Sequence, residues 1–541
     1  MVNDAGARTG LRGNPWLSLL VICLGFFMTL LDLTIVNIAI PSIIDELDVS
    51  ISSVLWVLNA YTLALVAILV TAGRLGDRWG AKRLFIGGLV LFTVASALCG
   101  WSSSIGELIA WRTVQGVGAA IIIPQTLTVL TASFPPAKRG AAFGIWGAVS
   151  GVAIVAGPTV GGLLVTSLSW RWIFFVNVPI GVAVVALAAA ILVDHRTASQ
   201  HRIDALGVLL SSTGLLILTY AITEGRHYHW GTIRGVISVP LLVVVGVVLI
   251  GVFAGQQWRR QDREPLVPFA LFRDRNYAVM SFVALAISIG MIGFVLPLTI
   301  YLQSVLGFSA LKAGLTIAPM AVVSIVIAPL SGWLSDRTDG KYIMIAGMLF
   351  FAGGLFVFTV QATTDSGQWG FLAGLIAVGV GMGCTFAPMS AIAMRDVQPA
   401  FAGAASGVMN TVRQVGSVIG TVAVGVLLQA QLVQAVTTQA GSDAATLPVA
   451  LREPFVRALT GVAQNGLEGG VSGSGSPATP AALRTLGQHT FNHAYVMAMR
   501  YTLVLPAVIL VVGAAVALLV RRSGSARREP AAAAAEPVPQ G

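Results

Sequence analysis

The chain has 541 residues, of which 56% are hydrophobic and only 10% are charged, and its mean hydropathy is +0.86. A water-soluble protein needs roughly 25% charged residues to cover its surface, so this composition excludes an ordinary soluble enzyme or binding domain and indicates a protein built into a bilayer. The formal net charge is +10. The Lys and Arg residues gather in alternate connecting segments, an arrangement that orients a membrane protein and requires no nucleic-acid partner.

Apolar stretches of about 20 residues, the length that spans ~30 Å of hydrocarbon, recur along nearly the whole chain. They predict an all-α polytopic membrane protein with fourteen transmembrane helices. The helices are expected to begin near residues 16, 52, 82, 106, 141, 172, 205, 235, 277, 312, 342, 368, 402 and 494.

The first apolar run, residues 16–41, carries an acid near its middle. A carboxylate such as Asp32 costs at least ~2.5 kcal/mol in hydrocarbon on insertion scales, so it marks a candidate functional site. The run is too long, and too poorly followed by a cleavage site, to be a removable signal peptide.

Residues 73–83, between the second and third runs, read GRLGDRWGAKR. Gly73 and Gly80 allow a close helix approach and a tight turn. Asp77 is placed to hold Arg78 or a partner elsewhere in the chain. An ion pair made in one conformation and broken in another would act as a conformational latch.

The fourth apolar run, 105–131, contains Arg112 and, three residues later, Gln115. At ~1.5 Å per residue, these residues and Asp32 lie roughly 10–15 Å from the same membrane surface. The three side chains are therefore expected to form one polar network. Burial favours the neutral form of Asp32 and Arg112 favours its carboxylate, and these opposed effects make Asp32 a candidate proton carrier.

The fifth run is rich in small residues, which let helices pack closely, and contains a proline that permits a bend. These residues are Gly147, Gly151, Gly157, Pro158, Gly161 and Gly162. We expect the helix to flex at Pro158.

Residues 332–337 repeat the G-x-L-x-D-R pattern of residues 73–78, so Asp336 and Arg337 join the candidate latch. Each copy follows the second helix of a six-helix unit. This repeat predicts two halves related by an axis along the membrane normal, with a substrate site between them. The helices of residues 201–260 are then an inserted hairpin.

Polar and aromatic residues within the spans are candidates for contacting a substrate. They are Asn37, Trp56, Asn59, Tyr61, Gln125 and, from the second half, Arg413. No group of Cys and His residues has the spacing of a metal site.

The chain is accordingly divided into five segments. They are an N-terminal segment 1–15, a first half 16–200, the hairpin 201–260, a second half 261–520 with an external loop 431–493, and a tail 521–541 that is expected to be disordered. The loop is expected to hold an amphipathic stretch at 451–462 and a flexible linker at 466–480. The distribution of basic residues places both termini on the cytoplasmic side.

Four motifs, taken in order, resemble those of the major facilitator superfamily, and more narrowly the fourteen-helix drug:proton antiporters of the QacA- and EmrB-like group. The motifs are residues 31–41 (LDLTIVNIAIP), 73–83, 112–118 and 147–162, and the resemblance covers about residues 15–525. Ala81 departs from the loop motif, which usually has a basic residue there, and Ala153 stands where the antiporter motif often has a glycine.

The resemblance implies a multi-pass protein of a bacterial plasma membrane that exports hydrophobic or amphipathic drugs, from the cytoplasm or the inner leaflet, in exchange for protons. The proton gradient supplies the energy and no cofactor is expected, since the chain has no G-x-x-x-x-G-K-[ST] motif for ATP. Asp32, as the single central acid, predicts about one proton per cycle.

Three alternatives are considered. A dedicated exporter of one antibiotic, lipid or metabolite would use the same coupling residues, and loop 431–493 would suit a periplasmic or lipid partner. Solute:proton symport into the cell is a further alternative, although the motif at 147–162 marks exporters in the family that the chain resembles. A membrane enzyme is not indicated, because the sequence shows no nucleophile–base pair at the membrane surface.

Overall fold

The computed structural model describes residues 12–49, 51–135, 138–194, 204–225, 228, 231–261, 265–398, 401–445, 447–464 and 481–521. The first half contains α1 (Pro15–Leu47), α2 (Ile51–Trp79), α3 (Ala81–Trp101), α4 (Ile105–Ser133), α5 (Arg139–Ser167), α6 (Trp172–Phe175) and α7 (Asn177–Ile191). The short α6 and α7 together make the sixth span.

The inserted segment consists of α8 (Ala205–Glu224), a small antiparallel pair of strands, β1 (Thr232–Arg234) and β2 (Ile237–Ser238), and α9 (Val239–Arg259). The apolar run near residue 235 predicts a helix there, but residues 232–238 form the strand pair and the helix begins at Val239. Ser238 caps it by accepting a hydrogen bond from the backbone N–H of Leu241. Helix α8 packs against α2 of the first half and also contacts the second-half helix α15 (Ala402–Ala444).

The second half contains α10 (Ala270–Arg273), α11 (Arg275–Ile300), which continues as a π-helical turn at Tyr301–Val305, α12 (Ala310–Arg337), α13 (Gly340–Gln361), α14 (Leu372–Ala393), α15 (Ala402–Ala444), α16 (Val449–Gln464), α18 (Ala481–Thr502) and α19 (Val504–Ala517). Among the described residues, 13 helical segments are long and apolar enough to cross a membrane. With the 29-residue α5, they give the predicted fourteen spans.

Polar side chains begin many of these helices by capping free backbone N–H groups. Asn14 accepts from the N–H of Trp16 at the start of α1, and Asp274 accepts from the N–H of Tyr277 at the start of α11. Each cap satisfies a backbone N–H that has no partner within its own helix.

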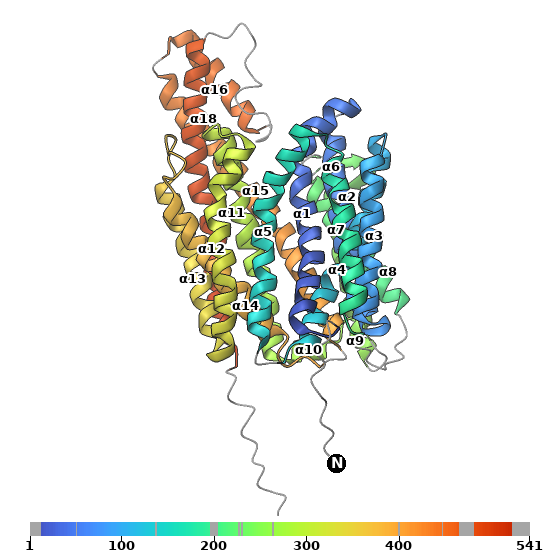
Figure 1. Cartoon of the computed structure of the whole chain (residues 1–541). Helices are drawn as coiled ribbons and strands as arrows, with labels where there is room; N and C mark the ends of the chain where they lie inside the picture. The colour runs from blue at the N-terminus through green and yellow to red at the C-terminus, as the bar shows by residue number, and fades with distance from the viewer. Residues whose placement is uncertain are drawn as a thin grey trace, which may run out of the picture.

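The segment predicted as an external loop, 431–493, is largely helical. The amphipathic stretch expected at 451–462 falls within α16, but the continuation of α15 and the helix over 481–493 were not expected and correct the prediction. Helix α15 has 43 residues, a length of about 65 Å against ~30 Å of hydrocarbon, so it continues well beyond the membrane. It packs there against α16 and α18, and the hydroxyl of Thr490 donates to Asp443 at 2.6 Å. We call residues 431–464 and 481–493 the helical cap; it stands above the rest of the molecule in Figure 1. The predicted linker at 466–480 and the tail from 522 onward lie outside the described residues.

The two ends of the bundle differ. The end opposite the helical cap carries the α2–α3 turn at Gly80, the α12–α13 turn at Asp339 and the start of α5 at Arg139; we call it the basic end. Close approaches between the halves occur toward this end: Gly73 meets Gly403, and Gly140 meets Gly332, so closely that a Cβ on any of them would clash with backbone. The basic end is therefore closed.

Candidate functional site

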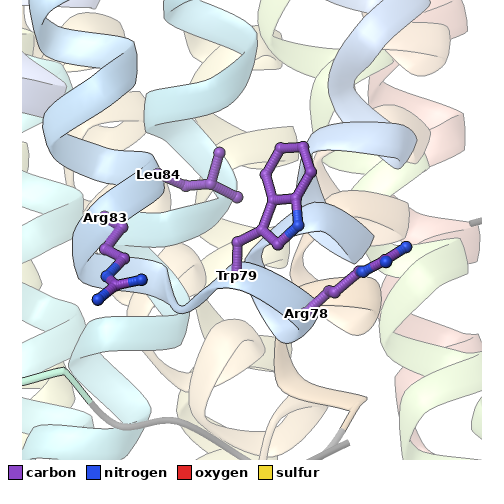
Figure 2. A pocket seen from close by; sticks show the side chains of 4 residues that line it. All are labelled: Arg78, Trp79, Arg83 and Leu84. Carbon is purple, nitrogen blue, oxygen red and sulfur yellow. The ribbon is translucent and has the colours of Figure 1, made fainter. Parts of the chain in front are cut away.

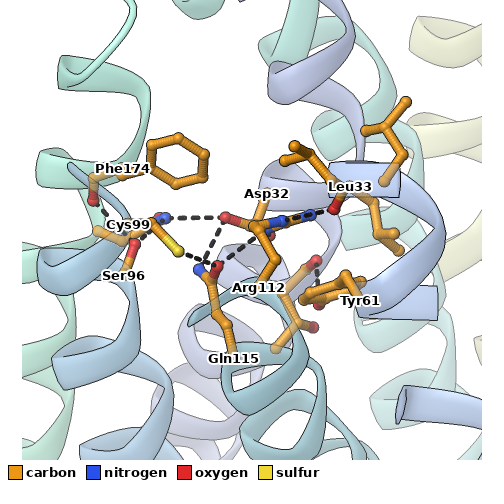
Figure 3. A network of polar contacts seen from close by, with 12 residues as sticks. Asp32, Leu33, Tyr61, Ser96, Cys99, Arg112, Gln115 and Phe174 are labelled. Carbon is orange, nitrogen blue, oxygen red and sulfur yellow. Dashed lines mark hydrogen bonds and ion pairs between the residues drawn. The ribbon is translucent and has the colours of Figure 1, made fainter. Parts of the chain in front are cut away.

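Asp32 lies at the centre of a fully enclosed polar network in the first half (Figure 3). Its Oδ2 forms an ion pair with Arg112 Nη1. Its Oδ1 accepts hydrogen bonds from Gln115 Nε2 at 2.9 Å and from Asn177 Nδ2 at 3.2 Å. All four residues are 0% exposed. The network that depth along the helices predicts for Asp32, Arg112 and Gln115 is present.

Arg112 is held by more than its ion pair. Its Nη1 also donates to Gln115 Oε1 at 2.8 Å, and its Nε donates to the carbonyl of Val57 at 3.2 Å. The guanidinium carbon lies 4.3 Å from the centre of the Tyr61 ring, a cation–π contact. Among the described residues, Nη2 has no hydrogen-bond partner. A buried charge with one unsatisfied nitrogen depends heavily on Asp32 for compensation.

The network also contains Asn177 and Ser96, which were not predicted from the sequence. Asn177 also lies 3.1 Å from Ser96 Oγ, and the Ser96 hydroxyl donates to the carbonyl of Phe174 at 2.9 Å. Cys99 Sγ lies 3.7 Å from Gln115 Oε1. An amide at the start of an otherwise apolar span was the available signal for Asn177, because polar groups in hydrocarbon need partners.

Asp77 connects the two halves at the basic end. Its carboxylate accepts hydrogen bonds from the backbone N–H groups of Gly403 at 2.7 Å and Ala404 at 2.9 Å, at the first turn of α15. The free N–H groups and positive dipole of a helix N-terminus favour such a carboxylate. The cation beside Asp77 is Arg74, at 3.7 Å.

Asp336 makes the same contact in the opposite direction. It accepts hydrogen bonds from the N–H groups of Gly140 at 2.7 Å and Ala141 at 2.9 Å, at the first turn of α5. Each half therefore supplies one carboxylate to a helix N-terminus of the other. The sequence repeat corresponds to a symmetric pair of contacts between the halves.

The arginines predicted for the latch lie elsewhere. Arg78 is exposed and lines, with Trp79, Arg83 and Leu84, a surface pocket of about 400 Å³ (Figure 2). Arg337 is also exposed and lies over the ring of Trp333 at 3.9 Å. Gly80 forms the turn, with φ of 92°, a value that favours glycine.

The glycines of α5 face two neighbours. A Cβ on Gly147 would lie 3.5 Å from Phe386, and one on Gly151 would lie 3.0 Å from Ile325, both in the second half. Gly157 and Gly161 instead face α1, at Thr34 and Ile35, and Gly162 has open space around it. Helix α5 is continuous from Arg139 to Ser167; the side chain of Pro158 lies outside the described residues.

Three predicted substrate contacts are placed elsewhere by the structure. Trp56 lies against Tyr220 of the inserted α8, with ring centres 5.6 Å apart, and Asn59 donates to Glu224 at 3.4 Å. Both face the hairpin rather than the second half. Gln125 is buried and donates to the carbonyl of Ala72 at 2.9 Å, so it joins α4 to α2.

The other three predicted substrate contacts have different surroundings. Tyr61 belongs to the enclosed network beneath Arg112, and its hydroxyl donates to the carbonyl of Thr29 at 3.3 Å. Asn37 is exposed and donates to the carbonyl of Leu33 in its own helix. Arg413 is partly exposed and lies 5.0 Å from the Phe386 ring centre, near the first half.

Two helical halves that close against each other at one end, one of which contains a buried acid–base pair, are features of an alternating-access membrane transporter. The Major Facilitator Superfamily profile matches residues 22–421. The chain belongs to the major facilitator superfamily, a family of transporters rather than enzymes.

Two relatives and one solved structure place it further. The chain is 34% identical over 430 residues to the tetracenomycin C resistance and export protein of Streptomyces glaucescens, covering 78% of each chain. It is 33% identical over 417 residues to the multidrug resistance protein Stp of Mycobacterium tuberculosis, covering 77% of this chain and 76% of that one. The human organic anion transporter MFSD10 superposes with a TM-score of 0.56 at 12% identity, covering 92% of this chain and 99% of that chain, a likeness of fold alone.

Proposed function

We propose that this protein exports hydrophobic or amphipathic drugs across a bacterial plasma membrane in exchange for protons. The observation that carries the proposal is the fully buried pair of Asp32 and Arg112, in a chain whose relatives are named as antibiotic and multidrug resistance or export proteins. An intramembrane acid with a single basic partner is the arrangement that a proton relay needs.

The hydrogen bonds around Asp32 support the proposal that this conformation holds its carboxylate form. Arg112, Gln115 and Asn177 all donate to its oxygens, and donors favour the carboxylate. Protonation removes the negative charge and leaves the Arg112 guanidinium buried without compensation, which is costly in a low-dielectric interior. A rearrangement of α1 against α4 relieves this cost, and in this way the proton drives the conformational change.

The basic end is the cytoplasmic end in this proposal, because basic residues concentrate there and the positive-inside rule then orients both termini inward. The conformation is accordingly closed to the cytoplasm. Drug binding from the cytoplasm or inner leaflet favours the deprotonated protein, and this difference in affinity is sufficient for coupling. One acid gives one proton per cycle, and no cofactor takes part.

The test compares wild type with Asp32→Asn in proteoliposomes under an imposed pH gradient. Two dyes are used, cationic ethidium and anionic fluorescein, and lumenal pH is followed at the same time. Asp45→Asn, which alters an exposed acid of the same helix, is the matched control. We expect gradient-driven dye movement in wild type and control, and its loss in Asp32→Asn. Full gradient-driven transport by Asp32→Asn would contradict the mechanism.

A second candidate is dedicated export of one antibiotic, lipid or metabolite by the same coupling. It is supported by the relatives' names, since one refers to tetracenomycin C and another, 35% identical over 421 residues, is a probable actinorhodin transporter of Streptomyces coelicolor. A wild type that transports neither dye, but changes lumenal pH when a single metabolite is added, would favour this candidate.

The helical cap supports one further part of the proposal, a periplasmic or lipid partner on the outer side. Its helices are tied together by the Asp443–Thr490 hydrogen bond and by buried side chains such as Phe455 and Phe491. Exchange of residues 447–480 for a short linker tests this role: export from cells should fall while transport by the purified protein persists. Equal transport in cells would remove the partner from the proposal.

A further inference from the structure

Arg413 is a cation at mid-depth in the second half. It lies 11 residues after Ala402, the first residue of α15, and so about 16 Å from the basic end. This depth corresponds to the middle of the hydrocarbon layer, where an arginine faces a partner, the interior of the bundle or water.

Within the described residues, the Arg413 guanidinium has no ion-pair or hydrogen-bond partner. It makes a cation–π contact with Phe386, in which the guanidinium carbon lies 5.0 Å from the ring centre. Phe386 lies where the second half contacts the first, since a Cβ added to Gly147 would be 3.5 Å from the Cβ of Phe386. Arg413 is partly exposed. A partly exposed guanidinium at this depth, beside the other half, lies on the path between the halves.

The charge of Arg413 is not balanced by the first half. Asp32 and Arg112 neutralise each other, and both are 0% exposed. The described acids of the second half lie near the helix ends, as Asp336 does at the end of α12 and Asp443 does in the helical cap. The path between the halves therefore carries a net positive charge at its middle.

We infer that Arg413 makes the transport site selective for aromatic or amphipathic anions, with the guanidinium binding a carboxylate, phenolate or sulfonate and Phe386 contacting the adjoining ring. The inference rests on the proposed export function and names its substrate class. A guanidinium binds planar oxyanions through paired N–H donors and keeps its charge when buried. A lipophilic cation would meet repulsion at the same place.

The inference has a consequence for energy coupling. When one proton enters and one monoanion leaves, two positive charges move inward per cycle, so the membrane potential adds to the pH gradient. When one proton enters and one monocation leaves, no net charge moves. Accumulation of an anionic substrate should therefore respond to a potassium diffusion potential at constant pH gradient.

Binding to the full chain in lipid nanodiscs, without any gradient, tests the inference separately from transport. Fluorescence polarisation gives the affinities for fluorescein and for ethidium. Arg413→Gln should weaken fluorescein binding by about tenfold or more, the loss expected for one charge-assisted hydrogen bond, and should leave ethidium binding equal or tighter. Arg413→Lys, which keeps the charge but loses the paired N–H donors, should weaken fluorescein binding less than Arg413→Gln does.

Lys312→Gln is the matched control, because Lys312 also lies over an aromatic ring, Phe308 at 3.9 Å, but is exposed near the outer start of α12. It should bind both dyes as wild type does. The thermal melting temperature of each variant shows whether it has folded.

Three results would overturn the inference: a wild type that does not bind fluorescein, one that prefers ethidium, or a folded Arg413→Gln that binds fluorescein as tightly as wild type. If ethidium were nevertheless exported with dependence on Asp32, proton-coupled efflux would stand and only the anion selectivity would fail. If the wild type showed no gradient-driven transport of any compound, the proposed function itself would be contradicted.

Discussion

The two halves make the same kind of contact with each other at the basic end, but they differ in the charged residues that they hold at mid-depth. Each half provides an aspartate, Asp77 or Asp336, to a helix N-terminus of the other, with nearly the same distances. Among the described residues, the first half encloses a fully buried acid–base pair, whereas the second half holds Arg413 at mid-depth without an acidic partner. The repeat therefore preserves the parts that close the basic end, while the charged residues at mid-depth differ between the halves. On the proposals made above, those of the first half couple protons and Arg413 of the second half selects charge.

A close backbone approach between the halves, at Gly73, predicts the largest mechanical effect. In Gly73→Ala, the new Cβ would lie 2.4 Å from the backbone oxygen of Gly403, and no side chain can yield to relieve the clash. We expect the basic end to fail to close and gradient-driven transport to fall at least tenfold. Gly87→Ala, with nothing within 4 Å of its Cβ, is the matched control. Equal transport by the two variants would show that the halves do not need this contact.

The two aspartates are similar in geometry but not in surroundings. Asp77 has a side chain only 2% exposed and a neighbouring buried cation, Arg74, whereas Asp336 is partly exposed and its neighbour Arg337 points to Trp333. Asp77→Asn removes a charge from a helix N-terminus and also leaves Arg74 uncompensated. We expect it to shift the population toward an open basic end by about tenfold, and Asp336→Asn to shift it by about threefold.

Distances between spin labels on the basic ends of α3 and α13 measure this shift, because these helices belong to different halves. Long distances should be more populated in Asp77→Asn than in Asp336→Asn. An equal or larger shift in Asp336→Asn would mean that the burial of Asp77 and its neighbouring cation do not determine the strength of these contacts.

Residue type and depth along a helix were enough to predict much of this arrangement. Fourteen spans, the repeated latch aspartates and the network of Asp32, Arg112 and Gln115 all follow from apolar length, repeat and rise per residue. Rotation about the helix axis was not predictable, because nearly every face of these helices is apolar. Trp56 and Asn59 were predicted as substrate contacts, whereas in the structure both face the inserted α8.

The helical cap was predicted as a loop because its polarity rises after residue 430. Helix α15 continues beyond the membrane because residues 431–444 contain no proline and keep a buried stripe. Small or apolar residues recur there at every fourth position, at Leu432, Val436, Ala440 and Ala444. Outside the membrane, the spacing of apolar residues along the sequence was more informative about helix formation than the mean hydropathy.

Asn177 allows a smaller test of the first half. Asn177→Ala removes one of the donors to Asp32 but leaves Arg112 and Gln115 in place. We expect the initial rate of gradient-driven transport to fall about threefold, less than the loss in Asp32→Asn. Lumenal pH recordings in proteoliposomes measure it. A complete loss with normal folding would make Asn177 an essential member of the relay.

The inserted hairpin lies outside both halves, so changes there should alter stability and leave transport within about twofold. Asp204 caps α8 at the N–H of Gly207 and accepts hydrogen bonds from Gln256 and Gln257, each at 2.7 Å, beside Arg260 at 2.8 Å. Burial alone would raise the pKa of Asp204, but these hydrogen bonds and Arg260 outweigh it and lower the pKa below its ordinary value.

Because the folded-state pKa of Asp204 is depressed, its contribution to stability is present above the unfolded value of ~3.9 and is lost as pH falls through the lower folded value. Asp204→Asn should therefore lower the thermal melting temperature by a few degrees at pH 7. The difference from wild type should stay constant between pH 8 and 5 and shrink only below about pH 4. A difference that disappears near pH 6, or a matching loss of transport, would mean that the hairpin takes part in the proton-driven cycle.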